Sequence, residues 1–395
     1  MSWDVVRLGD VCDINPSAKG KLASFSSSML VSFLPMEAME AKTGVMKPVD
    51  REFAEVRKGY TYFENGDVLF AKITPCMQNG KHAVAQNLTN GIGFGSTEFH
   101  VLRPSVEVTS EWIYYLISQK EFLTNAENYF QGAVGQQRLP DDFLKKAEIL
   151  LPPLDEQRRI AAEIERQLAA VARTEQAAME QLEAAQKLNA AYLREVFEGN
   201  EWDMVWLKDV CEQTIKTISS DESGEMVYID ISSVDNIAKK IITPPIIPIK
   251  GAPSRAKQVL MPNDIILSTV RPNLNALAIN NIISDKPIVA STGFCVLRCK
   301  AKLDYRYLFQ FCMSETFIKN LSDIAKGSSY PAVTNTDVFI QTIPLPPLDE
   351  QRRIAVEIER QFISVEQAKK AMQYQLDTIN AMPAAILRQA FSGQM

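Results

Sequence analysis

Polar loops that carry Lys, Arg, Asn and Gln follow two apolar runs of strand length in this chain. These side chains suit base recognition, because Arg or Lys pairs with guanine and Asn or Gln pairs bidentately with adenine. A solvated turn that needs no ligand is the alternative for each loop. The candidate residues of the first loop are Lys72, Thr74, Gln78, Asn79 and Lys81, and those of the second are Ser268, Arg271, Asn273 and Asn275.

A second pair of candidate loops is rich in glycine and lies shortly before each of two long helical segments. Both loops end in amide, basic or hydroxyl side chains, which are groups that contact phosphates and base edges. The two histidines of the chain, His82 and His100, are expected to be ordinary loop or strand residues. The candidate residues are Gln136, Gln137 and Arg138 in the first loop, and Ser328, Ser329 and Tyr330 in the second.

The sequence lacks the motifs of the obvious catalytic alternatives. Adenine methylation needs a Pro-Pro-aromatic loop after Asn or Asp, and the Pro-Pro pairs at Pro152 and Pro244 lack both flanks. The glycines of segment 91–95 lead into an expected strand, whereas a nucleotide-binding loop leads into a helix. No P-loop is present, and the six cysteines form no Cys-x-x-Cys pair. We therefore predict no catalytic residue, no cofactor and no metal site in this chain.

The elements that must position these loops occur twice. LPPLDEQRRIAAEIERQ begins at Leu151 and LPPLDEQRRIAVEIERQ at Leu345, so sixteen of seventeen positions match at an offset of 194 residues. Trp3-Asp4 is echoed by Trp202-Asp203, and the stretches around the candidate loops recur as well. Many sequences would form an equally good helix, so local packing does not demand this identity. The duplication predicts pseudo-two-fold symmetry and a two-part ligand or partner.

The order of the chain is a globular half, a helix, a second globular half and a second helix. We place these parts at 1–150, 151–200, 201–344 and 345–395. Each half is expected to be a mixed α+β domain, with short strands and one or two helices. The expected strands are Val68–Ile73, Phe99–Leu102, Ile265–Val270 and Phe294–Leu297, and the expected helices are Trp112–Phe122 and Tyr307–Phe317.

Each long helix follows a Pro-Pro pair, has acidic residues in its first turn, and is followed by Gly199 or Gly393. About 40 residues give a length of roughly 60 Å. A single amphipathic helix of that length needs a mate, so we predict an antiparallel coiled coil of the two copies. Pro383 is expected to kink or locally break the second helix. The predicted pairing residues are Ile164, Leu168, Val171 and Leu182 in the first helix, and Ile358, Phe362, Val365 and Leu376 in the second.

Composition describes an ordinary soluble protein of 395 residues with 46% hydrophobic and 23% charged residues. No apolar stretch approaches the roughly 20 residues that span a bilayer, and the N-terminus lacks the pattern of a signal peptide, so a cytoplasmic location is expected. The net charge is −6, yet segment 239–302 holds ten Lys or Arg against two Asp. This stretch is either a solvated basic surface or a patch that faces phosphate.

One motif, Pro-Pro-Leu-x-Glu-Gln-x-x-Ile, opens both long helices, at Pro152 and at Pro346. Together with two diverged α/β halves, it resembles the specificity subunit of type I restriction–modification systems, over essentially the whole chain. The resemblance implies that each half is a target-recognition domain that binds one part of a bipartite site in double-stranded DNA. It also implies that the helices are spacers that hold two adenine-methyltransferase subunits, with an ATP-dependent translocating nuclease in the full complex. Methyl donor and ATP would belong to those partners.

Two other functions remain open at this point. One is a coiled-coil scaffold that bridges two copies of a protein partner and has no role on DNA, which leaves the basic stretch 239–302 without a purpose. The other is a self-sufficient DNA methyltransferase or nuclease, which the missing motifs disfavour. If the chain is a specificity subunit, a helix of roughly 60 Å limits the separation of the two DNA parts to about 18 base pairs.

Overall fold

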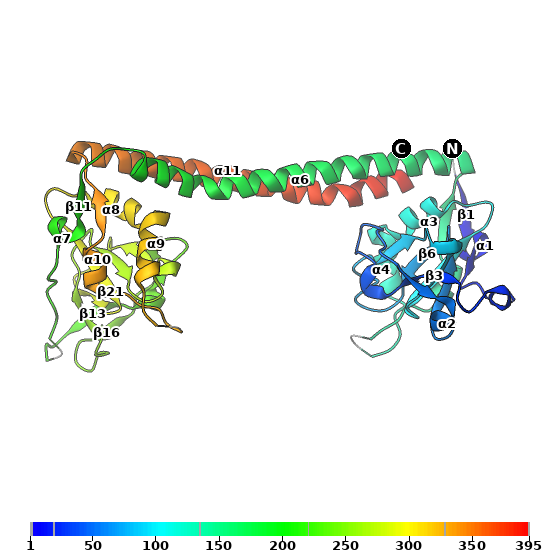
Figure 1. Cartoon of the computed structure of the whole chain (residues 1–395), viewed down its shortest axis with the longest axis horizontal. Helices are drawn as coiled ribbons and strands as arrows, with labels where there is room; N and C mark the ends of the chain where they lie inside the picture. Colours follow the sequence, from blue (N-terminus) through cyan, green and yellow to red (C-terminus); the bar gives the residue numbers. More distant parts are fainter. Residues whose placement is uncertain (1–2, 19, 134–135, 220, 328, 394–395) are drawn as a thin grey trace. The chain divides into compact units, whose positions relative to one another are not determined.

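The computed structural model describes residues 3–18, 20–133, 136–219, 221–327 and 329–393 (Figure 1). The chain divides into two compact units. One unit comprises Met1–Ala178 with Gln375–Met395, and the other comprises Met179–Tyr374. Each unit therefore contains one sheet-rich half together with parts of both long helices.

The first half contains two four-stranded sheets and one two-stranded pairing. The sheet β2-β9-β6-β7 is antiparallel throughout, with the bounds Cys12–Ile14, Phe99–Pro104, Val68–Ala71 and His82–Val84. The sheet β4-β3-β8-β5 contains one parallel pair, β3 with β8, and has the bounds Val49–Glu52, Leu30–Leu34, Ile92–Gly95 and Thr61–Glu64. Strand β1 (Asp4–Arg7) pairs with β10 (Glu148–Leu151).

The second half repeats these strand orders. The antiparallel sheet β12-β21-β18-β19 has the bounds Cys211–Glu212, Phe294–Cys299, Ile265–Ser268 and Leu277–Ile279. The sheet β16-β13-β20-β17, with β13 parallel to β20, has the bounds Ile246–Pro248, Glu225–Ile229, Ile288–Ser291 and Ala256–Val259. Strand β11 (Met204–Trp206) pairs with β22 (Thr342–Pro344), and β14 (Val234–Asp235) with β15 (Lys240–Ile241). The duplication therefore extends to the topology, although the two sequences have diverged.

The short helices differ from the prediction at one point in each half. Instead of one helix over 112–122, the chain forms α3 (Ser110–Ile117) and α4 (Lys120–Glu127), because Gln119 is extended, with ψ 136°. Instead of one helix over 307–317, it forms α8 and α9, because Ser314 is extended and its hydroxyl caps the second helix at Phe317 N–H. The remaining bounds are α8 Tyr305–Cys312, α9 Glu315–Ile324, α1 Leu8–Val11, α2 Phe53–Val56, α5 Asp141–Lys146, α7 Leu207–Val210 and α10 Asn335–Phe339.

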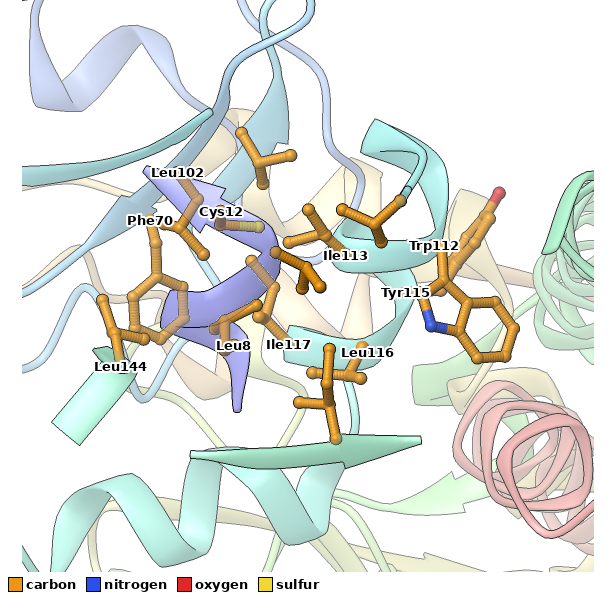
Figure 2. Packing of buried hydrophobic residues seen from close by; sticks show 14 of the residues in the cluster. Leu8, Cys12, Phe70, Leu102, Trp112, Ile113, Tyr115, Leu116, Ile117 and Leu144 are labelled. Atoms are coloured by element: carbon orange, nitrogen blue, oxygen red, sulfur yellow. The ribbon is translucent and has the colours of Figure 1, made fainter. Parts of the chain in front are cut away.

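The main core of the first half lies between its antiparallel sheet and α3. Phe70 of β6 and Trp112 of α3 are fully buried there, beside Leu8 and Leu144 of two short helices (Figure 2). Cys12 lies in this core and Cys211 in the equivalent core of the second half, where both are small buried side chains. Burial raises the pKa of the Cys12 thiol to about 12, which keeps it protonated and unreactive at neutral pH.

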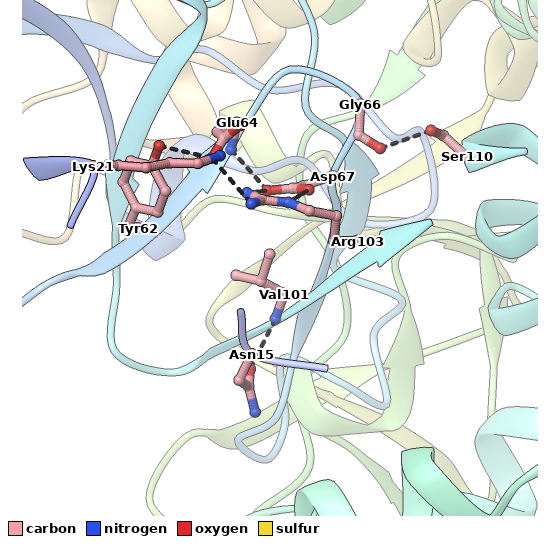
Figure 3. A network of polar contacts seen from close by, with 9 residues as sticks. All are labelled: Asn15, Lys21, Tyr62, Glu64, Gly66, Asp67, Val101, Arg103 and Ser110. Carbon is pink, nitrogen blue, oxygen red and sulfur yellow. Dashed lines mark hydrogen bonds and ion pairs between the residues drawn. The ribbon is translucent and has the colours of Figure 1, made fainter. Parts of the chain in front are cut away.

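An ion pair recurs at the entry of the central strand in both halves. The Arg103 guanidinium donates two hydrogen bonds to the Asp67 carboxylate, at 2.8 and 2.7 Å (Figure 3). Arg298 and Asp264 form the same pair, at 2.9 and 2.7 Å. Each Asp is almost fully buried and also accepts a backbone N–H of its own turn. A buried carboxylate needs such compensation, so these pairs explain why the turns recur in both halves.

The long helices are α6 (Leu154–Glu198) and α11 (Leu348–Phe391). In the first unit, Ile160 and Ile164 of α6 share a core with Leu387 near the end of α11. In the second unit, Leu193 near the end of α6 shares a core with Ile358 near the start of α11. The start of each helix thus packs against the end of the other, and the predicted antiparallel coiled coil in an α+β frame is confirmed.

Four of the eight predicted pairing residues lie in or against the cores that the two helices share. Ile164 and Ile358 are fully buried, and Leu168 and Phe362 pack against the same two cores. The others, Val171, Leu182, Val365 and Leu376, are half-buried.

The expected break at Pro383 is wrong, because α11 continues through this residue. Proline removes one backbone hydrogen bond from a helix. Ile379 and Leu387, about one turn before and after it, are both buried. Their packing holds the helix together across the lost bond.

No helix among the described residues is long and apolar enough to cross a membrane. The same residues contain no group of three or more His, Cys, Asp or Glu that could hold a metal ion.

Candidate DNA interface

The two candidate loops of the first half lie side by side. Ile73 forms an antiparallel bridge with Arg138. The Thr74 N–H donates to the Gln137 carbonyl at 3.0 Å, and the Gln137 N–H donates to the Thr74 hydroxyl at 3.2 Å. Residues from loop 72–81, after β6, and loop 131–138, before α5, therefore form one surface.

The second half brings its two candidate loops together in the same way. Val270 forms a bridge with Ala332, and the Arg271 N–H donates to the Pro331 carbonyl at 2.7 Å. The Arg271 guanidinium lies over the Tyr330 ring, 4.7 Å from its centroid. The juxtaposition joins residues that are far apart in the sequence, and it recurs in both halves.

Most of the candidate side chains on these surfaces are exposed. Lys72 and Gln137 are half-buried. The exposed candidates are Gln78, Asn79, Gln136, Arg138, Arg271, Asn273, Ser329 and Tyr330. Ser328 lies outside the described residues.

Four candidates use their side chains inside the protein. Ser268 is buried, and its hydroxyl donates to the Val270 carbonyl at 2.9 Å. Asn275 is also buried and donates to the Cys312 carbonyl at 3.2 Å. The Lys81 ammonium donates to the Met36 carbonyl at 2.9 Å, and Thr74 is the buried acceptor described above. These four side chains shape the loops, and we do not propose that they contact DNA.

The two arginines of the site differ in electrostatic environment. Arg138 forms a two-pronged ion pair with Glu98, with Nη2 2.7 Å from Oε1. The hydrogen bonds from Arg138 hold the pKa of the Glu98 carboxyl below its usual range, so Glu98 is ionised at neutral pH. Within the described part of the chain, Arg271 contacts no carboxylate, and its Nη2 donates only to the Ser329 carbonyl, at 3.4 Å. Arg271 is therefore the uncompensated cation of the pair.

Both histidines are buried strand residues, as expected. His82 in β7 forms a hydrogen bond with the Ser118 hydroxyl at 2.7 Å, and burial lowers its pKa to about 4. His100 in β9 bonds through Nε2 to the Leu139 carbonyl at 2.8 Å, and burial also lowers its pKa. Both imidazoles are neutral at physiological pH and belong to the frame.

The glycines of segment 91–95 have a packing role. Residues 92–95 form strand β8 themselves, and the segment leads into strand β9, as expected, rather than into a helix. A Cβ atom on Gly93 would lie 2.1 Å from the Phe63 ring, and one on Gly95 would lie 2.6 Å from the Leu34 carbonyl oxygen. Only glycine fits such close approaches.

A glutamine in the repeated passage has a role that sequence reasoning missed. Gln157 is fully buried, accepts the Thr109 N–H at 2.9 Å, and donates to the carbonyls of Glu107 and Pro152. Gln351 forms the same three bonds with Asp304, Lys302 and Pro346. Each glutamine thus fixes the first turn of a long helix to the loop before α3 or α8. The only sequence feature that could have indicated this role is that the glutamine is the one uncharged polar residue in the first turn of the helix.

Comparison with known proteins places this frame in a family. The model of the type I restriction modification DNA specificity domain matches residues 1–184 and 199–371. The EcoAI specificity subunit of Escherichia coli is 36% identical over 189 residues, which cover 47% of this chain and 31% of that protein. This chain therefore spans about a third of the length of that relative. The MjaVIII specificity subunit of Methanocaldococcus jannaschii is 24% identical, with 93% of this chain and 90% of that protein covered.

A solved structure shares the fold. The crystal structure of the HsdS subunit from Thermoanaerobacter tengcongensis has a TM-score of 0.72 and 23% identity, covering 100% of this chain and 97% of the other. The family model matches well over half of the chain, in two copies that correspond to the two halves. The chain belongs to the type I restriction modification DNA specificity family.

Proposed function

We propose that this chain is the sequence-recognition subunit of a type I restriction–modification complex, and that each half binds one part of a bipartite DNA site. The observation that carries the proposal is the paired-loop surface. In both halves, two polar loops that are distant in sequence are joined on the same strand frame. The frame recurs while the loop residues differ, which is what recognition of two different DNA sequences requires.

The side chains divide into two kinds of contact. Arg271 carries an uncompensated charge, and its stacking on Tyr330 orders the guanidinium while leaving it exposed. It suits a phosphate or the acceptor edge of guanine. Gln78 and Asn79 are exposed amides that suit adenine. Because the charge of Arg138 is compensated by Glu98, we assign Arg138 a positioning role in its loop.

The start of each long helix is proposed as a docking face for a partner. Arg158 pairs with Asp155, and Arg352 pairs with Asp349, both at 3.3 Å and both exposed; Arg352 also lies 3.7 Å from the Asp304 carboxylate. Exposed pairs of this kind add little stability, so folding does not explain their identity in the two copies. Two copies of the same partner would explain it. Identity of exposed residues is largely lost after the passage, for example at Arg173 and Gln367.

By the family relationship, we propose adenine-methylating subunits as these two partners, with translocating nuclease subunits in the full complex. The methyl donor and ATP would be bound by those subunits, and the chain itself would be non-catalytic and cytoplasmic. Among the described residues of the paired-loop surfaces, none is arranged as a nucleophile with a base, and both histidines are buried within the frame.

The test exchanges one half. Residues 1–150 are replaced by the first half of a related specificity protein, and methylated adenines are mapped in a host that carries the rest of the system. One part of the methylated sequence should change, and the other should stay as it was. A change in both parts, or in neither, would overturn the assignment of one DNA part to each half.

A scaffold without a role on DNA remains the competing function, and the same chain can exclude it. The scaffold predicts that charge reversal at Lys72 and Arg271 leaves binding to duplex DNA unchanged. The recognition subunit predicts a loss of affinity that is largest at low salt.

A further inference from the structure

A polar cleft of about 300 Å³ lies in the second half, next to the paired-loop surface. Of its polar residues, two come from edge strand β17 and two from the segment after β12. One comes from the turn between β20 and β21, and one from the start of α10. We call it the β17 cleft and define it by its polar residues: Gln213, Thr217, Lys257, Gln258, Thr292 and Asn335.

The walls of the β17 cleft are tied to each other and to the paired loops. Thr217 forms a bridge with Gln258, which joins the segment after β12 to the edge strand. Thr269 donates its N–H and its hydroxyl to the Gly293 carbonyl, both at 3.0 Å, and accepts the Val333 N–H at 2.9 Å. Thr269 lies two residues before Arg271. These bonds tie the neighbours of Thr292 and Asn335 in the cleft to the loop that carries the Arg271–Tyr330 stack.

The amide of Gln258 is held so that only its carbonyl oxygen is free to accept a hydrogen bond from a ligand. It is 9% exposed, and its Nε2 donates to the carbonyls of Ser291 at 2.9 Å and Phe294 at 2.8 Å. Both donor positions of the amide are thereby used. The Gln258 Oε1 receives no hydrogen bond from the described residues. Gln258 thus lines the cleft with an acceptor that has no donor among the described residues, and the two hydrogen bonds from Nε2 fix the orientation of its amide.

The charges around the cleft favour DNA. No carboxylate lines it, and Lys257 contributes a half-buried ammonium that forms no ion pair within the described part of the chain. Lys257 lies in the basic stretch 239–302. Much of that stretch serves the fold: Arg298 pairs with Asp264, and Lys239 donates to the Asn275 carbonyl at 2.5 Å. Lys257 is thus one of the basic residues of this stretch that can contact a phosphate, because it forms no ion pair within the described part of the chain.

The two halves differ at the position of Gln258. Ala290 pairs with Ile229 on one side and with Gln258 on the other. Gly95 occupies the place of Ala290 in the first half, where it pairs with Leu34 and with Thr61. Thr61 is therefore the counterpart of Gln258. An amide in one half thus stands where the other has a hydroxyl. A difference in chemistry at an equivalent position is expected where two halves discriminate different bases.

We propose that the β17 cleft receives a base edge of the second DNA part, with Gln258 as a specificity-determining residue and Lys257 as a contact to a neighbouring phosphate. This rests on the proposed function. A fixed carbonyl oxygen accepts a hydrogen bond only from a donor, so a base that it meets at the major-groove edge carries an exocyclic amino group there: N6 of adenine or N4 of cytosine. Guanine and thymine present an acceptor in that place and are rejected.

The test maps methylated adenines with the complete complex, in hosts where a variant is the only copy of the chain. Gln258→Met keeps the length of the side chain and removes the acceptor, together with the two hydrogen bonds that Nε2 donates to the Ser291 and Phe294 carbonyls. The preference for adenine or cytosine at one position of the second DNA part should fall roughly tenfold, and the first part should stay unchanged. An unaltered second part would overturn the proposal.

Two further variants separate specificity from folding and from charge. Thr292→Val changes an exposed residue at the mouth of the cleft without altering its volume and should relax the same position. If Gln258→Met fails to fold, the proposal is overturned when Thr292→Val leaves the methylated sequence of the second DNA part unchanged. Lys257→Ala, assayed with the purified chain and duplex DNA, should lower the slope of log affinity against log salt by about 0.9, equally for all sequences. An unchanged slope removes Lys257 from the interface.

The exchange of residues 1–150 and the Arg271→Ala variant distinguish this proposal from the proposed function. If these two changes alter methylation or DNA affinity and the cleft variants do not, the cleft proposal fails and the recognition function stands. If none of them has an effect, both fail.

Discussion

The guanidinium of Arg271 lies 4.7 Å from the centroid of the Tyr330 ring, and this stack joins two loops that the sequence separates. Arg271 also has φ 49°, in the left-handed region that non-glycine residues rarely adopt. A strained backbone and a stacked, exposed cation with no carboxylate partner among the described residues occur together at one point. Such strain is typically maintained at a functional site.

Arg271→Ala should weaken binding of duplex DNA by about 1–2 kcal/mol and reduce the salt slope by about 0.9, because one phosphate or base contact is lost. Titration of labelled duplex DNA at several salt concentrations measures both. Arg306→Ala is the matched control, since Arg306 also stacks on a tyrosine, Tyr305, but lies outside the paired loops. Equal effects of the two substitutions would show that general charge, rather than the stack, is responsible.

Glu98→Gln should strengthen DNA binding. The Glu98 carboxyl is ionised because its pKa is lowered by Arg138, so it repels phosphate and compensates the arginine. Glutamine preserves a hydrogen bond to Arg138 and removes the charge. The expected gain is about 0.5–1 kcal/mol at low salt, and it should disappear at high salt. A loss of affinity would mean that Arg138 must stay paired to hold its loop.

Gln157→Ala should lower the free energy of unfolding by roughly 2–4 kcal/mol, because it removes three hydrogen bonds and leaves buried backbone groups without partners. Denaturant unfolding of the full chain checks this. Gln351→Ala should behave alike. Arg158→Ala, one residue away but exposed, should change stability by no more than about 0.5 kcal/mol. A negligible effect of Gln157→Ala would refute the role of the glutamine in fixing the helix.

Charge reversal at the docking face should remove partners one at a time. Arg158→Glu with Arg159→Glu should leave a complex with one methyltransferase subunit, and adding Arg352→Glu and Arg353→Glu should leave none. Mass measurement of the purified complex gives the stoichiometry, and the DNA affinity of the chain alone should stay unchanged. Retention of two subunits by the fourfold variant would exclude this face.

Stability should fall as the pH is lowered from about 6.5 to about 4. His82 has a pKa of about 4 in the folded chain because it is buried, whereas the unfolded chain binds a proton near pH 6.5. Between these values the unfolded state binds more protons, so acid favours unfolding by roughly 2–3 kcal/mol across the window. Comparing the pH dependence of unfolding with that of His82→Asn isolates this contribution, which should be absent from the variant.

Much of the frame could be predicted from sequence because it depends on local patterns. The apolar runs at Val68 and Ile265 formed strands, and the repeated passage formed two antiparallel helices. The helix predicted over 112–122 was wrong because Gln119 is extended in a sequence whose apolar spacing continues past it. Periodicity alone does not show where a short helix ends.

The site was harder to predict because its residues meet through long-range pairing. The bridge of Ile73 with Arg138 joins loops that share no sequence signal. Ser268 and Asn275 are polar, as a contact residue would be, but packing buries them. The glutamines at 157 and 351 lay within the most obvious motif, yet their role depends on loops elsewhere in the chain.

The most direct test of the central claim is a map of methylated adenines in the host genome, with the chain present, deleted and restored. We predict one bipartite sequence of two defined parts separated by an undefined gap, methylated only when the chain is present. Methylation that persists after deletion, or a single continuous recognition sequence, would contradict the account.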